Sequence, residues 1–133
     1  STQIIPIIDV TESAEGSNVR EDLQSALSFA NGTTFSITSA TNTVIVNNTG
    51  YYRIFGLNWN NGNATSSINL FDGSTSKDII SFPSASSGVQ MTVPFDFVVF
   101  IDAGQSLRGT SANSSSILNG MSRQIATITG ELV

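Results

Sequence analysis

Acidic side chains are the main candidates for chemistry in this sequence, because it contains no histidine and no cysteine. Their absence excludes Ser-His-Asp and Cys-His catalysis, and also the usual imidazole and thiolate zinc sites. Asp96 and Asp102 fall on one face of a predicted strand, where a rise of about 3.3 Å per residue puts them roughly 20 Å apart. Paired glycosidase carboxylates lie only roughly 5–9.5 Å apart. We therefore expect no enzymatic activity.

The stretch DGSTSKD, which contains Asp72 and Asp78, is a candidate calcium loop. It lacks the dense alternating acids of an EF-hand loop. An Asp-Gly pair at a strand end is ordinarily a turn, since glycine takes positive φ without steric cost. The sequence therefore predicts a turn at Asp72-Gly73, with no metal and no cofactor.

Charged residues are sparse and mostly acidic. Of the 133 residues 11% are charged, and the net charge is −5. Nucleic-acid binding requires clustered cations, whereas the five basic residues are scattered along the chain. The apolar run IIPII is too short to span a membrane and is interrupted by Pro6. We expect no nucleic-acid partner, no membrane insertion and no small-molecule substrate.

Alternation of apolar and polar residues dominates the chain after residue 33, and turn-forming residues separate the strand-length segments. This pattern predicts an all-β sandwich or barrel. Asn60-Asn61-Gly62 indicates a hairpin turn, Pro94 indicates a bulge, bend or edge position, and RQIATITGELV is the predicted last strand.

The N-terminal part departs from this pattern, so we place an arm at 1–24 and the sandwich domain at 25–133. Five acids lie between Asp9 and Asp22 inclusive, which favours a solvated segment over a docking arm for a basic surface. The segment 19–30 has apolar residues at helical spacing, with one helical turn near 19–24 as an option. The Asn31-Gly32 turn signal instead favours a strand at 25–30. Helix and strand both remain open.

Two predicted strands, 50–60 and 95–102, carry large apolar side chains on both faces. A two-layer sandwich needs only one apolar face per strand, with the other facing water. A ligand, a helix of the same chain or another subunit must cover the second face. Its mid-strand residues favour a homo-oligomer interface: Phe55, Leu57, Val98 and Phe100. Tyr51 and Trp59, near the strand ends, form the alternative platform for a glycan.

Three motifs resemble the trimeric jelly rolls of the tumour-necrosis-factor and C1q-like group. TGYYRI is similar to that group's Gly-x-Tyr-x-aliphatic strand, FVVFIDAGQSLRG to its strand–turn–strand element, and IATITGELV to its final strand. The resemblance implies an antiparallel two-sheet jelly roll of about 8–10 strands that assembles as a homotrimer. It also implies that Arg53, Phe55 and Leu57 face the three-fold axis.

Within that group, a small acidic chain rich in serine, threonine and asparagine looks most like a bacteriophage head decoration (cement) protein. The resemblance implies a structural virion protein bound to the capsid exterior, with the major capsid protein as partner. The arm residues expected to contact the capsid are Ile4, Ile5, Pro6, Ile7 and Ile8. The alternatives are a trimeric glycan-binding head of a phage tail fibre and an extracellular C1q-like binding module.

Overall fold

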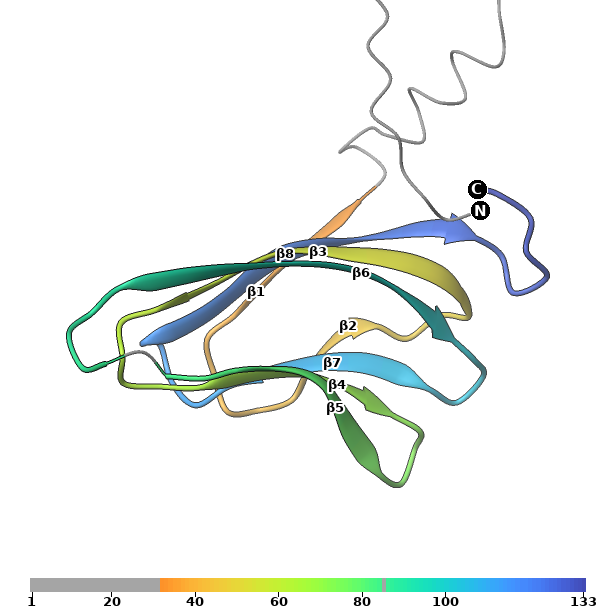
Figure 1. The fold of residues 1–133 in the computed structure, drawn as a ribbon. Helices are drawn as coiled ribbons and strands as arrows, with labels where there is room; N and C mark the ends of the chain where they lie inside the picture. Colours follow the sequence, from red (N-terminus) through yellow and green to blue (C-terminus); the bar gives the residue numbers. More distant parts are fainter. Residues whose placement is uncertain (1–31, 85) are drawn as a thin grey trace, which may run out of the picture.

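A computed structural model describes residues 32–84 and 86–133 of the chain (Figure 1). These residues form eight strands and no helix. The strands are β1 (Thr33–Ile37), β2 (Thr43–Val46), β3 (Gly50–Asn60), β4 (Ser66–Phe71), β5 (Ser76–Phe82), β6 (Met91–Ile101), β7 (Ser106–Ser111) and β8 (Ser116–Ala126). The predicted all-β class is confirmed. The helix-or-strand question at 19–30 and the domain boundary after residue 24 lie outside the described residues.

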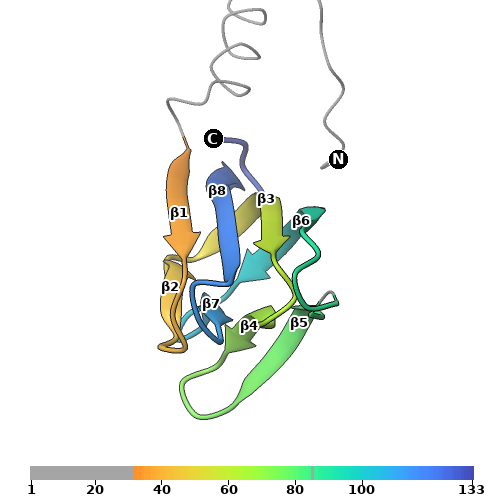
Figure 2. The same cartoon turned by 90° about the vertical axis from the view of Figure 1, so that its left-hand side faces the viewer.

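The strands form two antiparallel four-stranded sheets packed face to face (Figures 1 and 2). Sheet A has the order β1-β8-β3-β6, and sheet B has the order β2-β7-β4-β5. The first strand therefore pairs with the eighth, the second with the seventh, the third with the sixth and the fourth with the fifth. This is one long hairpin rolled into two layers, which is the connectivity of an eight-stranded jelly roll.

The core lies between the sheets because every second residue of each strand points inward. Ile54 on β3 and Ile68 on β4 are fully buried, and so are Ile101, Leu107 and Leu118. Burying each such side chain contributes about 1.5–3 kcal/mol relative to leaving it in water. The rings of Phe95 and Phe82 pack across the layers with centroids 5.7 Å apart.

One end of the interior is polar rather than apolar. Asn58 donates from Nδ2 to Ser116 Oγ at 2.9 Å, and the hydroxyls of Ser116 and Ser66 lie 2.5 Å apart. Ser111 Oγ donates to the carbonyl oxygen of Ser116 at 2.6 Å. All four residues are buried, so these bonds offset part of the cost of desolvating their polar groups, while Asn58 Oδ1 has no hydrogen-bond partner. The network joins β3 and β8 of sheet A to β4 and β7 of sheet B at this end.

Gly56 and Gly120 lie opposite each other in the β3–β8 register. A Cβ atom on Gly120 would lie 2.6 Å from both the Phe35 ring and the Phe55 carbonyl oxygen. Glycine at this position therefore lets Phe35, on β1, pack inward against the core.

Two local predictions differ from the structure. The last strand begins at Ser116 rather than Arg123 and ends at Ala126, because the serine- and glycine-containing stretch before Arg123 is part of the sheet rather than a loop. Gly62 has a φ of 96°, as its turn signal implies. The chain nevertheless crosses there from sheet A to sheet B, so β3 and β4 do not form a hairpin. Pro94 lies on β6, an edge strand of sheet A, as expected of a residue that cannot donate a backbone hydrogen bond.

Candidate functional site

The predicted second face of β3 and β6 is the outer face of sheet A, directed away from sheet B. The two strands are antiparallel neighbours, and Tyr51 pairs with Phe100 and Arg53 with Val98. All five predicted interface residues therefore lie on one continuous surface. We call its apolar part the apolar patch, and it consists of Tyr51, Phe55, Leu57, Val98 and Phe100.

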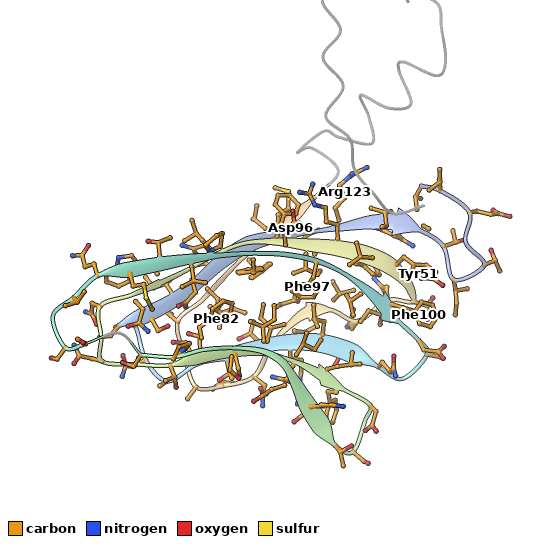
Figure 3. All side chains as sticks on the ribbon, in the orientation of Figure 1. Tyr51, Phe82, Asp96, Phe97, Phe100 and Arg123 are labelled. Carbon is orange, nitrogen blue, oxygen red and sulfur yellow. The ribbon has the colours of Figure 1, made fainter. Side chains whose placement is uncertain are left out.

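The apolar patch is substantially open to solvent in the single chain. Leu57, Val98 and Phe100 are 38%, 39% and 37% exposed, and Tyr51 and Phe55 are half-buried. The Tyr51 and Phe100 rings contact each other with centroids 4.8 Å apart at one end of the strands (Figure 3). Large apolar surfaces of this kind mark interaction sites on soluble proteins.

Arg53 and Asp96 form a two-point ion pair within this patch, between the Tyr51–Phe100 end and Leu57. Arg53 donates from Nε to Asp96 Oδ1 at 3.0 Å and from Nη2 to Oδ2 at 2.7 Å. The guanidinium also lies over the Phe55 ring, 4.3 Å from its centroid. The hydrogen bonds from Arg53 lower the pKa of Asp96, and those same bonds raise the pKa of Arg53. Asp96 is therefore a structural partner of Arg53.

Arg123 on β8 is a functional candidate that the sequence did not reveal. It lies directly opposite Arg53 in the β3–β8 register, on the same outer face (Figure 3). The residue is 7% exposed, and its Nε has no hydrogen-bond partner. Burial, and after it the positive charge of Arg53, lowers the pKa of Arg123. Only the register of β8 identifies this pair of arginines, and that register was not predicted.

The two aromatic residues predicted as a glycan platform do not share one patch. Tyr51 and Trp59 are both on the outer face of sheet A, but they lie near opposite ends of β3. Eight residues at about 3.3 Å each separate them by roughly 26 Å. Trp59 pairs instead with Thr92 on β6 and Ile117 on β8. One sugar ring cannot contact both aromatic side chains.

The acidic residues considered for chemistry have separate structural roles. Asp72 accepts hydrogen bonds from the backbone N–H groups of Thr75 and Ser74, at 2.8 and 2.9 Å, and from the Thr75 hydroxyl. These bonds, with that from the Thr75 N–H contributing most, lower the pKa of Asp72. The predicted turn is thus confirmed. Asp102 accepts a hydrogen bond from the Ala103 N–H at 2.7 Å, at the turn after β6.

Among the residues that the structure describes, no cluster of acidic, histidine or cysteine side chains could hold a metal ion. The same part of the chain contains no helix long and apolar enough to cross a membrane. The predicted capsid-contact residues, Ile4, Ile5, Pro6, Ile7 and Ile8, lie outside the described residues. The outer face of sheet A therefore stays the main candidate site, and it is suited to binding protein rather than to catalysis.

Comparison with known proteins identifies relatives among solved structures only. No protein-family model matches the chain, and no curated protein matches it. Two similar crystal structures are of a pentameric capsid protein isolated from metagenomic phage sequences. The first is 35% identical with a TM-score of 0.73, and the match covers 100% of this chain and 83% of that one. The second, phased with iodide, is 36% identical with a TM-score of 0.72, covering 100% and 85%.

These relatives overturn the predicted homotrimer, because both structures are pentameric. The exposed apolar residues of β3 and β6 mark a candidate contact surface, and they do not determine the number of copies in an assembly. The number of copies in a ring depends on the angle between the two surfaces through which each copy contacts its neighbours. The prediction of three copies came from the resemblance to the tumour-necrosis-factor and C1q-like group, and that part of the prediction is wrong.

Proposed function

The chain belongs to the same family as these phage capsid proteins, and we propose that it assembles as a homopentamer within a phage capsid. Through this family it is a structural virion protein and not an enzyme. The observation that carries the proposal is the pentameric state of relatives that match its whole length at 35% and 36% identity.

A closed ring of five requires two different surfaces on each subunit, because rotation about the axis brings one surface against a different surface of the neighbour. We assign the apolar patch to one of these two surfaces. Interfaces between identical subunits are more apolar than ordinary protein surface, with polar groups at the rim. The Arg53–Asp96 ion pair lies among the apolar residues of the patch, so it is a polar group that the neighbouring subunit would contact within that surface.

The mass of the full-length protein in solution tests this proposal. Native mass spectrometry or multi-angle light scattering should give five times the chain mass of 14.0 kDa. A single species with the mass of one chain, or with the mass of three chains, would contradict the pentamer.

We further propose that the pentamer lies on the outer surface of the phage head as a decoration protein. A five-fold ring has the symmetry of the vertices of an icosahedral shell, where it can bind without a mismatch of symmetry. The arm proposed at 1–24 would then contact the shell through Ile4, Ile5, Pro6, Ile7 and Ile8. Extended apolar segments of this kind bind by adding a strand to an exposed sheet edge.

Co-sedimentation with phage heads that lack this protein tests the location separately from the mass. We expect the full-length pentamer to sediment with the heads and a variant lacking residues 1–12 to remain in the supernatant. If neither protein sediments with the heads, the decoration role is wrong, whereas a mass of five chains in solution would still support the pentamer.

A further inference from the structure

The Arg123 side chain is 7% exposed, its Nε has no hydrogen-bond partner, and no acid in the described part of the chain pairs with it. A buried charge is costly unless it is paired, so an anion is expected beside it. Asp96 is bound to Arg53, and Asp72 and Asp102 accept hydrogen bonds from turn amides. Of the two remaining described acids, Asp78 lies on β5 of the opposite sheet and Glu131 lies beyond the end of β8.

The chain enters the sandwich at the same place. On β1, Thr33 pairs with Ser122 and Thr34 with Met121, so the antiparallel register puts Gly32 opposite Arg123. A Cβ atom on Gly32 would lie 2.6 Å from Met121 Cγ, so the backbone passes directly over that side chain. Gly32, the first described residue, therefore lies at the level of Arg123 on the neighbouring strand β8.

The composition of residues 1–31 complements this surface. The segment contains five acids and one arginine, so four of the five net negative charges of the protein belong to it. Glu21 and Asp22 are the nearest acids in sequence to Gly32. Ten residues of extended chain span up to roughly 33–36 Å, more than enough to return to Arg123. Apolar residues around these acids, such as Val19 and Leu23, match the Met121 surface.

We propose that the acidic N-terminal segment docks on the β1–β8 side of the outer face of sheet A in its own chain, with Glu21 and Asp22 pairing with Arg123. The apolar patch lies on the β3–β6 side of that face and stays available for a neighbouring subunit. This docking does not depend on the pentamer. In this proposal the acidic part of the arm binds the protein's own surface, and residues 4–8 remain free to contact a partner.

A charge-swap cycle in the full-length chain tests the pairing. Arg123→Glu and the double change Glu21→Arg with Asp22→Arg should each destabilise the fold, whereas their combination should recover stability. We expect a coupling of about tenfold or more in the unfolding equilibrium constant, as for hydrogen bonds between charged groups. Arg108→Glu on sheet B is the matched control and should show no coupling to the acid changes. If the acid changes have the same effect with and without Arg123→Glu, the proposal is overturned.

A spin-label measurement keeps the proposal testable if a charge-swap variant does not fold. Because the chain has no cysteine, Asn119→Cys gives a single attachment point on the outer face of sheet A. The label should broaden the amide resonances of residues 19–23, whereas a label at Ser67→Cys on sheet B should leave them sharp. No broadening from either position overturns the docking. Broadening seen only between labelled and isotope-enriched chains in a mixed sample places the segment on a neighbouring copy and contradicts docking within one chain.

Discussion

The two sheets differ on their outer faces far more than on their inner ones. Sheet A presents the apolar patch outward, together with the facing arginines of β3 and β8. Sheet B presents small polar groups, with Ser67 paired to Ser81 and Thr110, around an open hollow of about 600 Å³. Its exposed apolar residues, Val44 and Ile79, lie apart on the opposite edge strands β2 and β5. Its arginine, Arg108, stacks on Phe71 of its own sheet at 3.9 Å. The exposed apolar residues are therefore adjacent on sheet A and separated on sheet B.

Inward and outward positions of the same strands therefore have different roles: inward residues form the core, and outward residues form the surface available for contacts. Inward residues such as Ile54 of sheet A and Ile68 of sheet B are equally buried, so both layers contribute to one core. Outward residues do not take part in that core and can be chosen for a partner or for solvent. Substitutions at outward positions therefore test the two outer faces, and substitutions at inward positions, which affect the shared core, provide the reference.

The largest expected effect is on the shared core. Ile54→Ala and Ile68→Ala should each lower the free energy of unfolding by about 2–5 kcal/mol, because each leaves a cavity in a fully buried site. Urea denaturation of both variants measures the two losses. Similar losses of unfolding free energy support one core built from both sheets. A loss confined to one variant would show that the two sheets contribute unequally to the core.

The next effect separates the two outer faces directly. Leu57→Asp puts a charge into the apolar patch and should weaken the pentamer by about 2–4 kcal/mol per interface, typical of a central interface residue. Ile79→Asp on β5 of sheet B is the matched control, because Ile79 is 42% exposed and Leu57 is 38% exposed. Light scattering across a dilution series should show dissociation only for Leu57→Asp. Dissociation of the Ile79→Asp variant instead would move the interface to sheet B.

A smaller effect concerns the Arg53–Asp96 ion pair within the patch. The hydrogen bond from Arg53 lowers the pKa of Asp96 in the folded state below its unfolded value of about 3.9. The pair therefore stabilises the fold at pH values above about 4, and this contribution is lost as the pH falls through the folded-state pKa. Because the Asp96 side chain is 54% exposed, solvent screens the pair, and Asp96→Asn should cost less than about 1 kcal/mol at neutral pH.

Thermal unfolding of wild type and Asp96→Asn measures this contribution. The difference in Tm at neutral pH should shrink in concentrated salt and disappear under strongly acidic conditions. A difference that grows as the pH falls would contradict the assigned role of Arg53.

The smallest effect is expected on the outer face of sheet B. Ser67→Ala and Ser81→Ala remove hydroxyl groups that can bond to water, so each should change the unfolding free energy by less than about 0.5 kcal/mol. Neither change should alter the mass of the assembly. Loss of the pentamer in either variant would show that the polar face is also a subunit contact.

Alternation in β3 and β6 was sufficient to predict the apolar patch from sequence, because both strands carry large apolar residues at outward positions. The position of Arg123 could not be predicted, since Asn119 and Gly120 resemble a turn although they lie within β8. Their place in the strand depends on the close approach of Gly120 to β3, a tertiary contact. The pentameric state of the relatives was also beyond prediction, because the number of copies in a ring follows from the orientation of whole subunits and not from local composition.

Cysteine accessibility at matched positions on the two sheets most directly tests whether the apolar patch is covered by another copy. Val98→Cys on sheet A and Ile79→Cys on sheet B replace side chains that are 39% and 42% exposed in the single chain, and the protein has no other cysteine. In the assembled protein we predict that a maleimide reagent labels the thiol on sheet B rapidly and the thiol on sheet A at least about tenfold more slowly, with the difference lost after unfolding. Equal labelling rates in the assembled protein would contradict burial of the outer face of sheet A between subunits.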